Sequence, residues 1–362
     1  MIMGHLEGQK GGAMKDFIQI SKYAGMREDL VQAGGGNSSE KLDGNRMVIK
    51  ASGIQMADIT EKDGYSIVDY QAIRQYMDTL ASQKFPDEKT KILEETLLAG
   101  RRPSIETYLH AITGRVTLHT HSVAVNVLAS RQGGMEELQG IFPDALCVDY
   151  ATPGLKLAQV YYRSYLREMN RKKREIHRIF LKNHGVVISG DSAEEVIQIS
   201  EETNKTIEDR VGMDCQAYRH GFEIYKNLQG WGIGDKKLVV KAENKIILDA
   251  YQACGYSLWD YQMCPDCVVF CGKHPMDYEQ ISGRESLQNF LSCYGEPILI
   301  SYGKDLFIRG ESIKKAREIE SVLAFSAQVF LLNQGQSLEI LSSEEQSFLL
   351  NWDAEKYRQK IT

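Results

Sequence analysis

Segments with the two-residue period of a β-strand alternate with segments of helical period along most of this 362-residue chain. In residues 115–121, for example, the strand period puts His119 and His121 on the same face. The patterns predict helices at residues 15–34, 69–99 (interrupted at Pro86), 103–114, 123–128 and 192–210, and strands at 42–49 (with a tight turn at 43–45), 115–121 and 186–188. Such an alternation predicts an α/β fold.

The pattern starts again after about residue 231. Apolar runs at 238–240, 268–270, 298–300 and 306–308 lie among helical segments at 247–254 and 312–332. At about 150 residues per domain, a chain of this length is expected to form two domains. We therefore predict a glycine-rich flexible tail at 1–14, a first domain at 15–230 and a smaller C-terminal α/β domain at 231–362.

Composition argues against several classes of protein. The longest apolar runs are far shorter than the roughly 20 residues that span a bilayer, and residues 1–14 lack the apolar core of a signal peptide. A net charge of −6, from 43 basic and 49 acidic residues, argues against a nucleic-acid surface. Seven unevenly spaced cysteines without an export signal indicate free thiols. We expect a cytoplasmic protein that binds neither nucleic acid nor membrane.

Three histidines and one glutamate are candidates for a metal site. His119 and His121 stand two apart on a predicted strand, so their α-carbons lie roughly 6.6 Å apart on one face and both rings can reach one ion. Two hydrogen-bonded surface histidines would give the same pattern. Catalytic metals usually take three protein ligands, and His184, in a Lys-Asn-His-Gly segment, is either the third or a loop histidine. Glu106 lies near a helix start. It is a fourth candidate ligand, or its negative charge is there simply because it interacts favourably with the helix dipole.

Small residues at 34–39, Gly-Gly-Gly-Asn-Ser-Ser, indicate a place where backbone amides and hydroxyls can bind an oxyanion such as phosphate. The segment lacks the lysine of a P-loop and the preceding strand of a dinucleotide-binding fingerprint, which disfavours ATP and NAD. Ser52-Gly53 and Ser104 offer further small donors. Each of these segments, taken separately, is also typical of a turn.

Five motifs in this order resemble the class II aldolase/adducin family: GGGNSSEK at 34–41, KASG at 50–53, RPSIET at 102–107, LHTH at 118–121 and LKNHG at 181–185. The resemblance implies a three-layer α/β/α domain with a central, mostly antiparallel sheet and a divalent cation, usually zinc. By the same resemblance His119, His121 and His184 match the metal ligands and Glu106 the catalytic carboxylate. The positions that match those binding the substrate phosphate are Asn37, Ser52, Gly53 and Ser104.

A finer resemblance rests on IKASGIQMADI, PSIETYLHA and the ending NWDAEKYR at 351–358. These segments are similar to the aldolase portion of long-form rhamnulose-1-phosphate aldolases, which are often fused to a short-chain dehydrogenase. No dehydrogenase domain fits after Thr362, so we expect the aldolase portion alone. Short family members also use a tyrosine from a neighbouring subunit as an acid, and no equivalent is identified here. Family members are commonly tetramers, which implies a homo-oligomer.

The resemblance implies a lyase. The implied reaction is a metal-dependent retro-aldol cleavage of a ketose 1-phosphate to dihydroxyacetone phosphate and an aldehyde, through a metal-stabilised enediolate. Three histidines suit Zn²⁺, and Mn, Co or Fe are alternatives. Epimerases, dehydratases and decarboxylases of the same family act on sugar phosphates through related enolates and remain alternatives. A non-catalytic, adducin-like binding module is disfavoured, because the four candidate metal-site residues are present and a basic C-terminal tail is absent.

Three of the seven cysteines cluster in the run CPDCVVFC at 264–271. Cys264, Cys267 and Cys271 resemble half of a zinc site. A structural zinc site needs four ligands, and the other candidates nearby, Cys254, His274 and Cys293, are irregularly spaced. A second metal is therefore not the favoured interpretation of this cluster.

Overall fold

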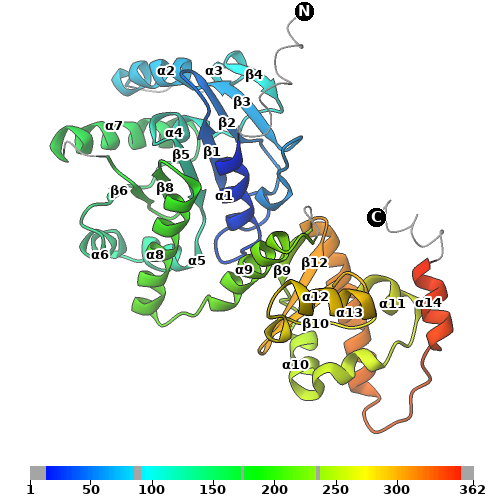
Figure 1. Ribbon diagram of the computed structural model, residues 1–362. Coiled ribbons are helices and arrows are strands. Elements are labelled where there is room, and N and C mark those ends of the chain that lie inside the picture. The colour runs from blue at the N-terminus through cyan, green and yellow to red at the C-terminus, as the bar shows by residue number, and fades with distance from the viewer. Residues whose placement is uncertain (1–13, 85–90, 173–174, 234–236, 352–362) are drawn as a thin grey trace, which may run out of the picture. The chain divides into compact units, whose positions relative to one another are not determined.

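The computed structural model describes residues 14–84, 91–172, 175–233 and 237–351. The chain divides into two compact units, Met1–Cys215 and Gln216–Thr362, and we describe each by itself (Figure 1). The predicted tail, except Met14, and nearly all of the NWDAEKYR segment lie outside the described residues.

The first unit is built on an eight-stranded sheet with the strand order β4-β3-β2-β1-β5-β8-β7-β6. Neighbouring strands are antiparallel throughout, except for the parallel pair β6 and β7. This confirms the largely antiparallel sheet expected for the domain. The strands are β1 (Asn37–Lys41), β2 (Arg46–Lys50), β3 (Tyr65–Asp69), β4 (Leu97–Gly100), β5 (Val116–Thr120), β6 (Leu146–Val148), β7 (Arg178–Leu181) and β8 (Gly185–Gly190).

Helices cover both faces of this sheet and complete the three layers (Figure 1). Alternate residues of β2 show the division: Met47 and Ile49 join a core with α2, α4 and α7, whereas Val48 packs with Phe17 of α1. Helices α5 and α8 pack with each other, and α8 also packs with α1. The helices are α1 (Lys15–Gly25), α2 (Tyr70–Ser82), α3 (Ile92–Glu95), α4 (Thr107–Ile112), α5 (Val123–Ala129), α6 (Gly134–Ile141), α7 (Leu155–Lys172) and α8 (Ala193–Val211), with a 3₁₀ turn at Met56–Asp58.

Several element boundaries differ from the sequence prediction. Helix α1 ends at Gly25 rather than Gly34. Gly25 packs closely on the 3₁₀ turn, where an added Cβ would lie 2.1 Å from the backbone nitrogen of Ala57. Residues 97–99, the end of the helix predicted at 69–99, instead lie in the edge strand β4. Helix α8 begins as predicted, with the Ser192 hydroxyl accepting a hydrogen bond from the Glu195 amide at 3.1 Å.

The second unit contains a four-stranded sheet in the order β10-β11-β12-β9. Its strands are β9 (Leu238–Lys241), β10 (Met276–Asp277), β11 (Leu299–Tyr302) and β12 (Asp305–Gly310). Its helices are α9 (Gln216–Gly230), α10 (Lys245–Cys254), α11 (Pro265–Cys271), α12 (Arg284–Tyr294), α13 (Ile313–Leu332) and α14 (Ser343–Asn351), with 3₁₀ turns at Gly255–Asp260 and Tyr278–Gln280.

The division of the chain falls earlier than the predicted boundary at 230/231. Helix α9 belongs to the second unit because it packs on β9, with Gly221 close to the carbonyl of Val239 and the ring of Phe307. The apolar run 268–270 lies in helix α11, whose first position is Pro265. The other three apolar runs of this unit contribute to strands, as a second α/β unit requires.

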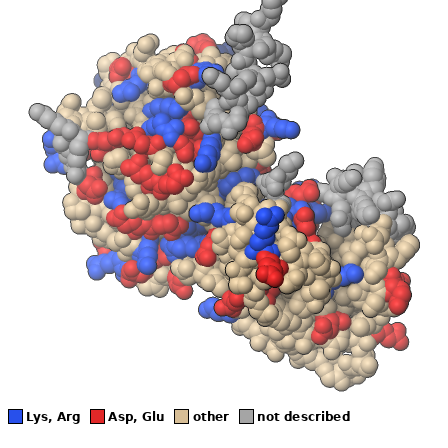
Figure 2. All heavy atoms as spheres, in the orientation of Figure 1, with Lys and Arg blue, Asp and Glu red and all other residues tan. Residues whose placement is uncertain are grey.

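Charges of both signs are mixed on the surface. On the face drawn in Figure 2, basic and acidic side chains of the first unit are interspersed. Ion pairs of the first unit include Arg178 with Glu202 at 2.9 Å and Arg210 with Glu137 at 3.0 Å. Among the helices of the described residues, none has both the length and the apolarity to cross a membrane.

Candidate metal centre

Strand β5 carries two of the candidate histidines at its carboxyl end. His119 is 2% exposed and lies in register with Asn37 of β1 and Val187 of β8. His121 follows the last residue of the strand, and its ring centroid lies 5.0 Å from that of His119. The spacing of two residues therefore brings both imidazoles to one region, as the strand period predicts.

A backbone hydrogen bond fixes the tautomer of His119. Its Nδ1–H donates to the carbonyl oxygen of Val186 at 3.0 Å, and a carbonyl can only accept. In the neutral ring the other nitrogen, Nε2, then carries a lone pair. This Nε2 faces Glu106, and a histidine oriented through its remote nitrogen in this way is typical of a metal ligand.

His184 reaches the same region from the turn between β7 and β8. Asn183 adopts a left-handed conformation with φ of 55°, which makes this turn tight. The His184 backbone is held on both sides: its amide donates to the carbonyl of Leu181 at 3.1 Å, and its carbonyl accepts from Asn126 Nδ2 at 3.1 Å. The ring centroid lies 4.9 Å from that of His119 and 5.1 Å from that of His121.

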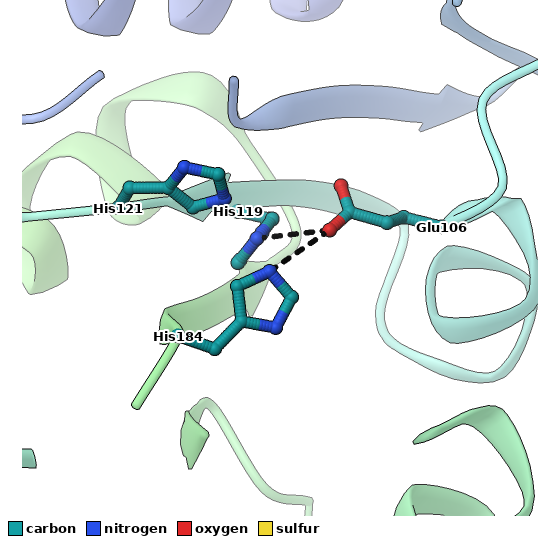
Figure 3. A group of neighbouring side chains, drawn as sticks. All are labelled: Glu106, His119, His121 and His184. Carbon is teal, nitrogen blue, oxygen red and sulfur yellow. Dashed lines mark ion pairs between the residues drawn. The ribbon is translucent and has the colours of Figure 1, made fainter. Parts of the chain in front are cut away.

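Glu106 approaches the three histidines from the residue just before α4 (Figure 3). Its Oε1 lies 3.2 Å from Nε2 of His119 and 3.3 Å from Nε2 of His184. Helix α4 begins at Thr107, four residues later than the predicted start at Pro103. Glu106 is therefore at the N-cap position and projects toward the site.

The four groups perturb one another electrostatically. Burial would raise the pKa of the Glu106 carboxyl, but the charges and hydrogen bonds of His119 and His184 hold it well below its usual range. Burial would lower the pKa of His119, but Glu106 raises it above that of an ordinary histidine. For His121, burial and the charge on His119 lower the pKa to about 4. One carboxylate thus compensates part of the positive charge that the histidines can carry.

The side chains present fit a divalent transition metal. One potential ligand atom from each of Glu106, His119, His121 and His184 lies within 4.8 Å of all the others. Within the described part of the chain, the buried Nε2 of His121 has no hydrogen-bond partner, and the buried Nε2 of His119 faces only the Glu106 carboxylate, 3.2 Å away. Buried polar atoms normally have partners, and three imidazoles with a carboxylate form a donor set that suits zinc and its neighbours.

Asn37, one of the candidate phosphate ligands, lies next to this centre. It is the first residue of β1, fully buried, and directly opposite His119 in the sheet. Its side-chain oxygen accepts from the Ser38 amide at 3.0 Å, while its Nδ2 has no partner among the described residues. The free N–H groups can donate to a substrate oxyanion. Ser38 and Ser39 lie on β1 rather than in a loop, and their hydroxyls bond Ser21 and His110 instead.

Ser52, Gly53 and Ser104 come together through an isolated bridge between Ala51 and Pro103. The Ser52 amide donates to the carbonyl of Arg102 at 3.0 Å, and Ser52 and Gly53 are exposed. The Ser104 hydroxyl accepts from the Glu106 amide at 3.3 Å. The turn at Gly53 also lies beside Gly34, where an added Cβ would be 3.8 Å from the Gly53 carbonyl. The four candidate phosphate ligands thus lie on adjoining segments.

Sequence reasoning missed Lys50, which joins two of these segments. Its side chain is buried, and Nζ donates to the carbonyls of Gly34 at 3.0 Å and Ile54 at 2.8 Å. Burial lowers its pKa, and Glu106 opposes that shift. A lysine inside the apolar run Met47–Ala51 was the signal that could have indicated it. Sequence reasoning also missed that Gly35 packs on the ring of His121. A Cβ at position 35 would lie 2.7 Å from His121 Nδ1.

A hollow of about 230 Å³ adjoins Ser52. Its lining includes Arg102, Lys91, Ile105 and Tyr108, so it combines two basic groups with apolar and aromatic surface. None of the four metal-site candidates lines it. A group of the substrate that extends past Ser52 would meet these side chains.

Residues 15–211 match the family model described as Class II Aldolase and Adducin N-terminal domain, and the chain belongs to this family. The match covers the whole α/β/α unit and all eight candidate site residues. A comparison with curated proteins found no match.

Three solved structures illustrate the similarity. A class II aldolase domain from Thermoplasma acidophilum is 23% identical, with 55% of this chain and 93% of that one covered at a TM-score of 0.47. The L-fuculose-1-phosphate aldolase from Thermus thermophilus is 16% identical, with 54% and 92% covered at 0.35. A sugar-phosphate aldolase from Thermotoga maritima is 15% identical, with 56% and 98% covered at 0.37.

Proposed function

We propose that this chain is a divalent-metal-dependent aldehyde-lyase that cleaves a ketose 1-phosphate to dihydroxyacetone phosphate and an aldehyde. One observation carries the proposal: Glu106 and three histidines converge within 4.8 Å, and the buried Nε2 of His121 has no hydrogen-bond partner among the described residues. Membership of the class II aldolase and adducin family supports the same conclusion.

His119, His121 and His184 hold the ion, which we propose to be Zn²⁺ or else Mn, Co or Fe. When bound, the ion supplies Lewis-acid polarisation of the substrate carbonyl and stabilises the negative charge that develops on its oxygen. The hydrogen bond to Val186 keeps the His119 ring turned toward the site. Asn126 does the same for His184 through the backbone carbonyl.

Glu106 carries the proton at C3 of the three-carbon product. In the reverse condensation its carboxylate removes that proton, and in cleavage it passes to C3 the proton that the C4 hydroxyl loses as the aldehyde forms. Positioned general acids and bases of this kind contribute typically about 10²–10⁴-fold in rate. The low pKa of Glu106 in the presence of His119 and His184 keeps the carboxylate charged beside the ligands.

Asn37, Ser52, Gly53 and Ser104 bind the substrate phosphate. Asn37 offers a buried amide with free N–H groups, and Ser52 and Gly53 offer an exposed turn with φ of 77° at Gly53. Lys50 holds this turn beside the glycine loop through the carbonyls of Gly34 and Ile54. Anchoring the phosphate holds C2 and C3 of the substrate in place beside the catalytic groups. This contributes to the rate by proximity and orientation.

The test is product analysis with metal-depleted and zinc-loaded protein. A panel of ketose 1-phosphates, including the rhamnulose and fuculose compounds, is assayed for dihydroxyacetone phosphate. We expect release with at least one substrate, lost on chelation and restored by a divalent metal. His184→Ala should abolish it, whereas His177→Ala should not, because His177 bonds the carbonyl of Ser189 outside the site. No release from any ketose 1-phosphate by the metal-loaded protein would refute the aldolase reaction.

The same experiment separates the alternative functions. An epimerase, dehydratase or decarboxylase would convert a sugar phosphate without releasing dihydroxyacetone phosphate. Protein purified without chelators that holds no stoichiometric metal would favour a binding module of the adducin type. We further propose a homo-oligomer, a tetramer by family resemblance, to be measured by light scattering.

A further inference from the structure

Two cysteines lie in contact in the second unit, whereas the candidate metal centre belongs to the first unit. Cys264 immediately precedes α11 and Cys267 is its third residue, and their sulfur atoms are 3.2 Å apart. Cys264 is half-buried and Cys267 is 2% exposed. All seven cysteines of the chain lie within the described residues, and none of them forms a disulfide. The pair is therefore reduced and already in contact.

The surroundings disfavour the metal-binding interpretation of the cluster. Over the described residues, two groups of three or more possible ligand atoms lie within 4.8 Å of one another, and neither includes these cysteines. The third thiol of the run, Cys271, is 3% exposed and packs in the apolar core of the second unit. A zinc site closed by two thiolates alone would lack two of its four ligands.

We propose that Cys264 and Cys267 form a thiol–disulfide exchange site whose co-reactant is a low-molecular-weight disulfide such as oxidised glutathione. The sulfurs need to approach by only about 1 Å to reach the roughly 2.0 Å of a disulfide bond.

The exchange proceeds in two steps that balance. The Cys264 thiolate attacks one sulfur of the small disulfide, so that a mixed disulfide forms at Cys264 and the first small thiolate leaves. Cys267 then attacks the Cys264 sulfur and passes its proton to the departing small thiolate, so that the Cys264–Cys267 bond forms and the second small thiol leaves. Two protein thiols are oxidised and one disulfide is reduced to two thiols.

The order of attack follows from accessibility. Cys264 can be reached from solvent, whereas Cys267 cannot. Burial, with a further contribution from the hydrogen bond with Cys264, raises the pKa of Cys267 to about 11, so it remains a thiol in the resting protein. Cys264 is thus the attacking residue and Cys267 the resolving one.

The test uses the full chain incubated with oxidised glutathione, quenched in acid, alkylated and mapped by mass spectrometry. In the wild type we expect a peptide in which Cys264 and Cys267 are joined, lighter by two hydrogen atoms. In Cys267→Ser the glutathione adduct should persist on Cys264, at a level at least about tenfold above the wild type, because the resolving thiol is absent. In Cys264→Ser, Cys267 should stay free. Cys293→Ser, which removes an exposed cysteine, should leave the joined peptide unchanged.

Two results would overturn the proposal. One is wild-type protein in which Cys264 and Cys267 are both recovered as free thiols while exposed Cys293 carries glutathione. The other is a metal ion bound to the purified protein that is lost in Cys264→Ser and that protects both thiols from alkylation. The wild-type experiment decides without any variant, and circular dichroism checks that each serine variant is folded.

Discussion

Replacing Gly35 with alanine tests whether the glycine loop sets the position of His121. The added Cβ would lie 2.7 Å from Nδ1 and 3.0 Å from Cε1 of that ring. Cβ atoms essentially never approach other heavy atoms closer than 3.0 Å, and ordinary contact begins at 3.4 Å. The ring or the loop must therefore give way by about 0.3 Å to reach the shortest tolerated distance, and by about 0.7 Å to reach ordinary van der Waals separation.

The loop has little freedom to retreat. The ammonium group of Lys50 holds the carbonyl of Gly34 at 3.0 Å, and Gly36 packs between Val31 and the carbonyl of His119. We expect His121 to move instead. Metal–ligand distances tolerate only about 0.2 Å of error, so the displacement exceeds what a bound ion accepts. By analogy with the loss of a residue that orients a ligand, zinc affinity should fall about 10–100-fold, or about 1.4–2.7 kcal/mol.

Competition with a chromophoric chelator measures this affinity. Gly44→Ala is the matched control, because no atom lies within 4 Å of its added Cβ. Both variants should melt within a few degrees of the wild type in the presence of chelator, since Gly35 contributes no side chain to the core. A Gly35→Ala protein that is folded and binds zinc as tightly as Gly44→Ala would show that the loop does not position His121.

Three further predictions concern catalysis, pH and metal removal. Glu106→Gln should retain zinc on three histidines but lose about 10²–10⁴-fold in kcat. The control is Glu137→Gln, which removes a surface ion pair with Arg210 and should keep normal turnover. Near-normal cleavage by Glu106→Gln would show that Glu106 does not carry the proton. Burial lowers the pKa of Lys41 to about 8 against 10.5 for an ordinary lysine. From about pH 8 to 10.5 the unfolded chain therefore binds more protons than the folded protein, and the free energy of unfolding rises with pH. Denaturant titration should show that wild type gains stability relative to Lys41→Met in that window. If the free energies of unfolding of the two proteins changed in parallel with pH, the lowered pKa of Lys41 would be contradicted. Chelation of zinc should lower the melting temperature of the first unit in the wild type, and the decrease should be larger the higher the free zinc concentration was before chelation. The melting temperature of His119→Ala should not change on chelation.

Local patterns predicted much of the fold of the first unit. The turn residues 43–45 joined β1 to β2 as expected, and the cap at Ser192 began α8 within one residue of its prediction. The failures share a cause: tertiary packing overrode local preference. Residues 97–99 continue the helical spacing of the predicted helix, but they lie in β4, which pairs with β3 at the sheet edge. The apolar run 268–270 could be a strand or a buried helix by its pattern alone, and Pro265 selected the helix.

The sequence singled out all four side chains that converge at the candidate metal centre, but not what orients them. The motifs gave residue types and order, whereas the partners of His119 and His184 are a backbone carbonyl and a remote amide, Val186 and Asn126. No spacing rule predicts such contacts. Gly35 illustrates the limit, since a run of three glycines suggests a turn but does not say which ring requires the space.

Sheet register explains why the metal ligands converge from distant parts of the chain. In the antiparallel pair of β5 and β8, Thr120 lies opposite Val186, so the end of β5 meets the start of β8. His121, just past one strand, and His184, just before the other, must therefore be neighbours. The pairing of Asn37 with His119 adds the start of β1 to the same place. Strand pairing thus accounts for the three histidines and for Asn37, whereas Glu106 depends on the packing of α4, whose Tyr108 and Leu109 lie in the core beneath it. Because the metal ligands and the proposed proton carrier are held by different parts of the fold, substitutions can separate metal affinity from turnover.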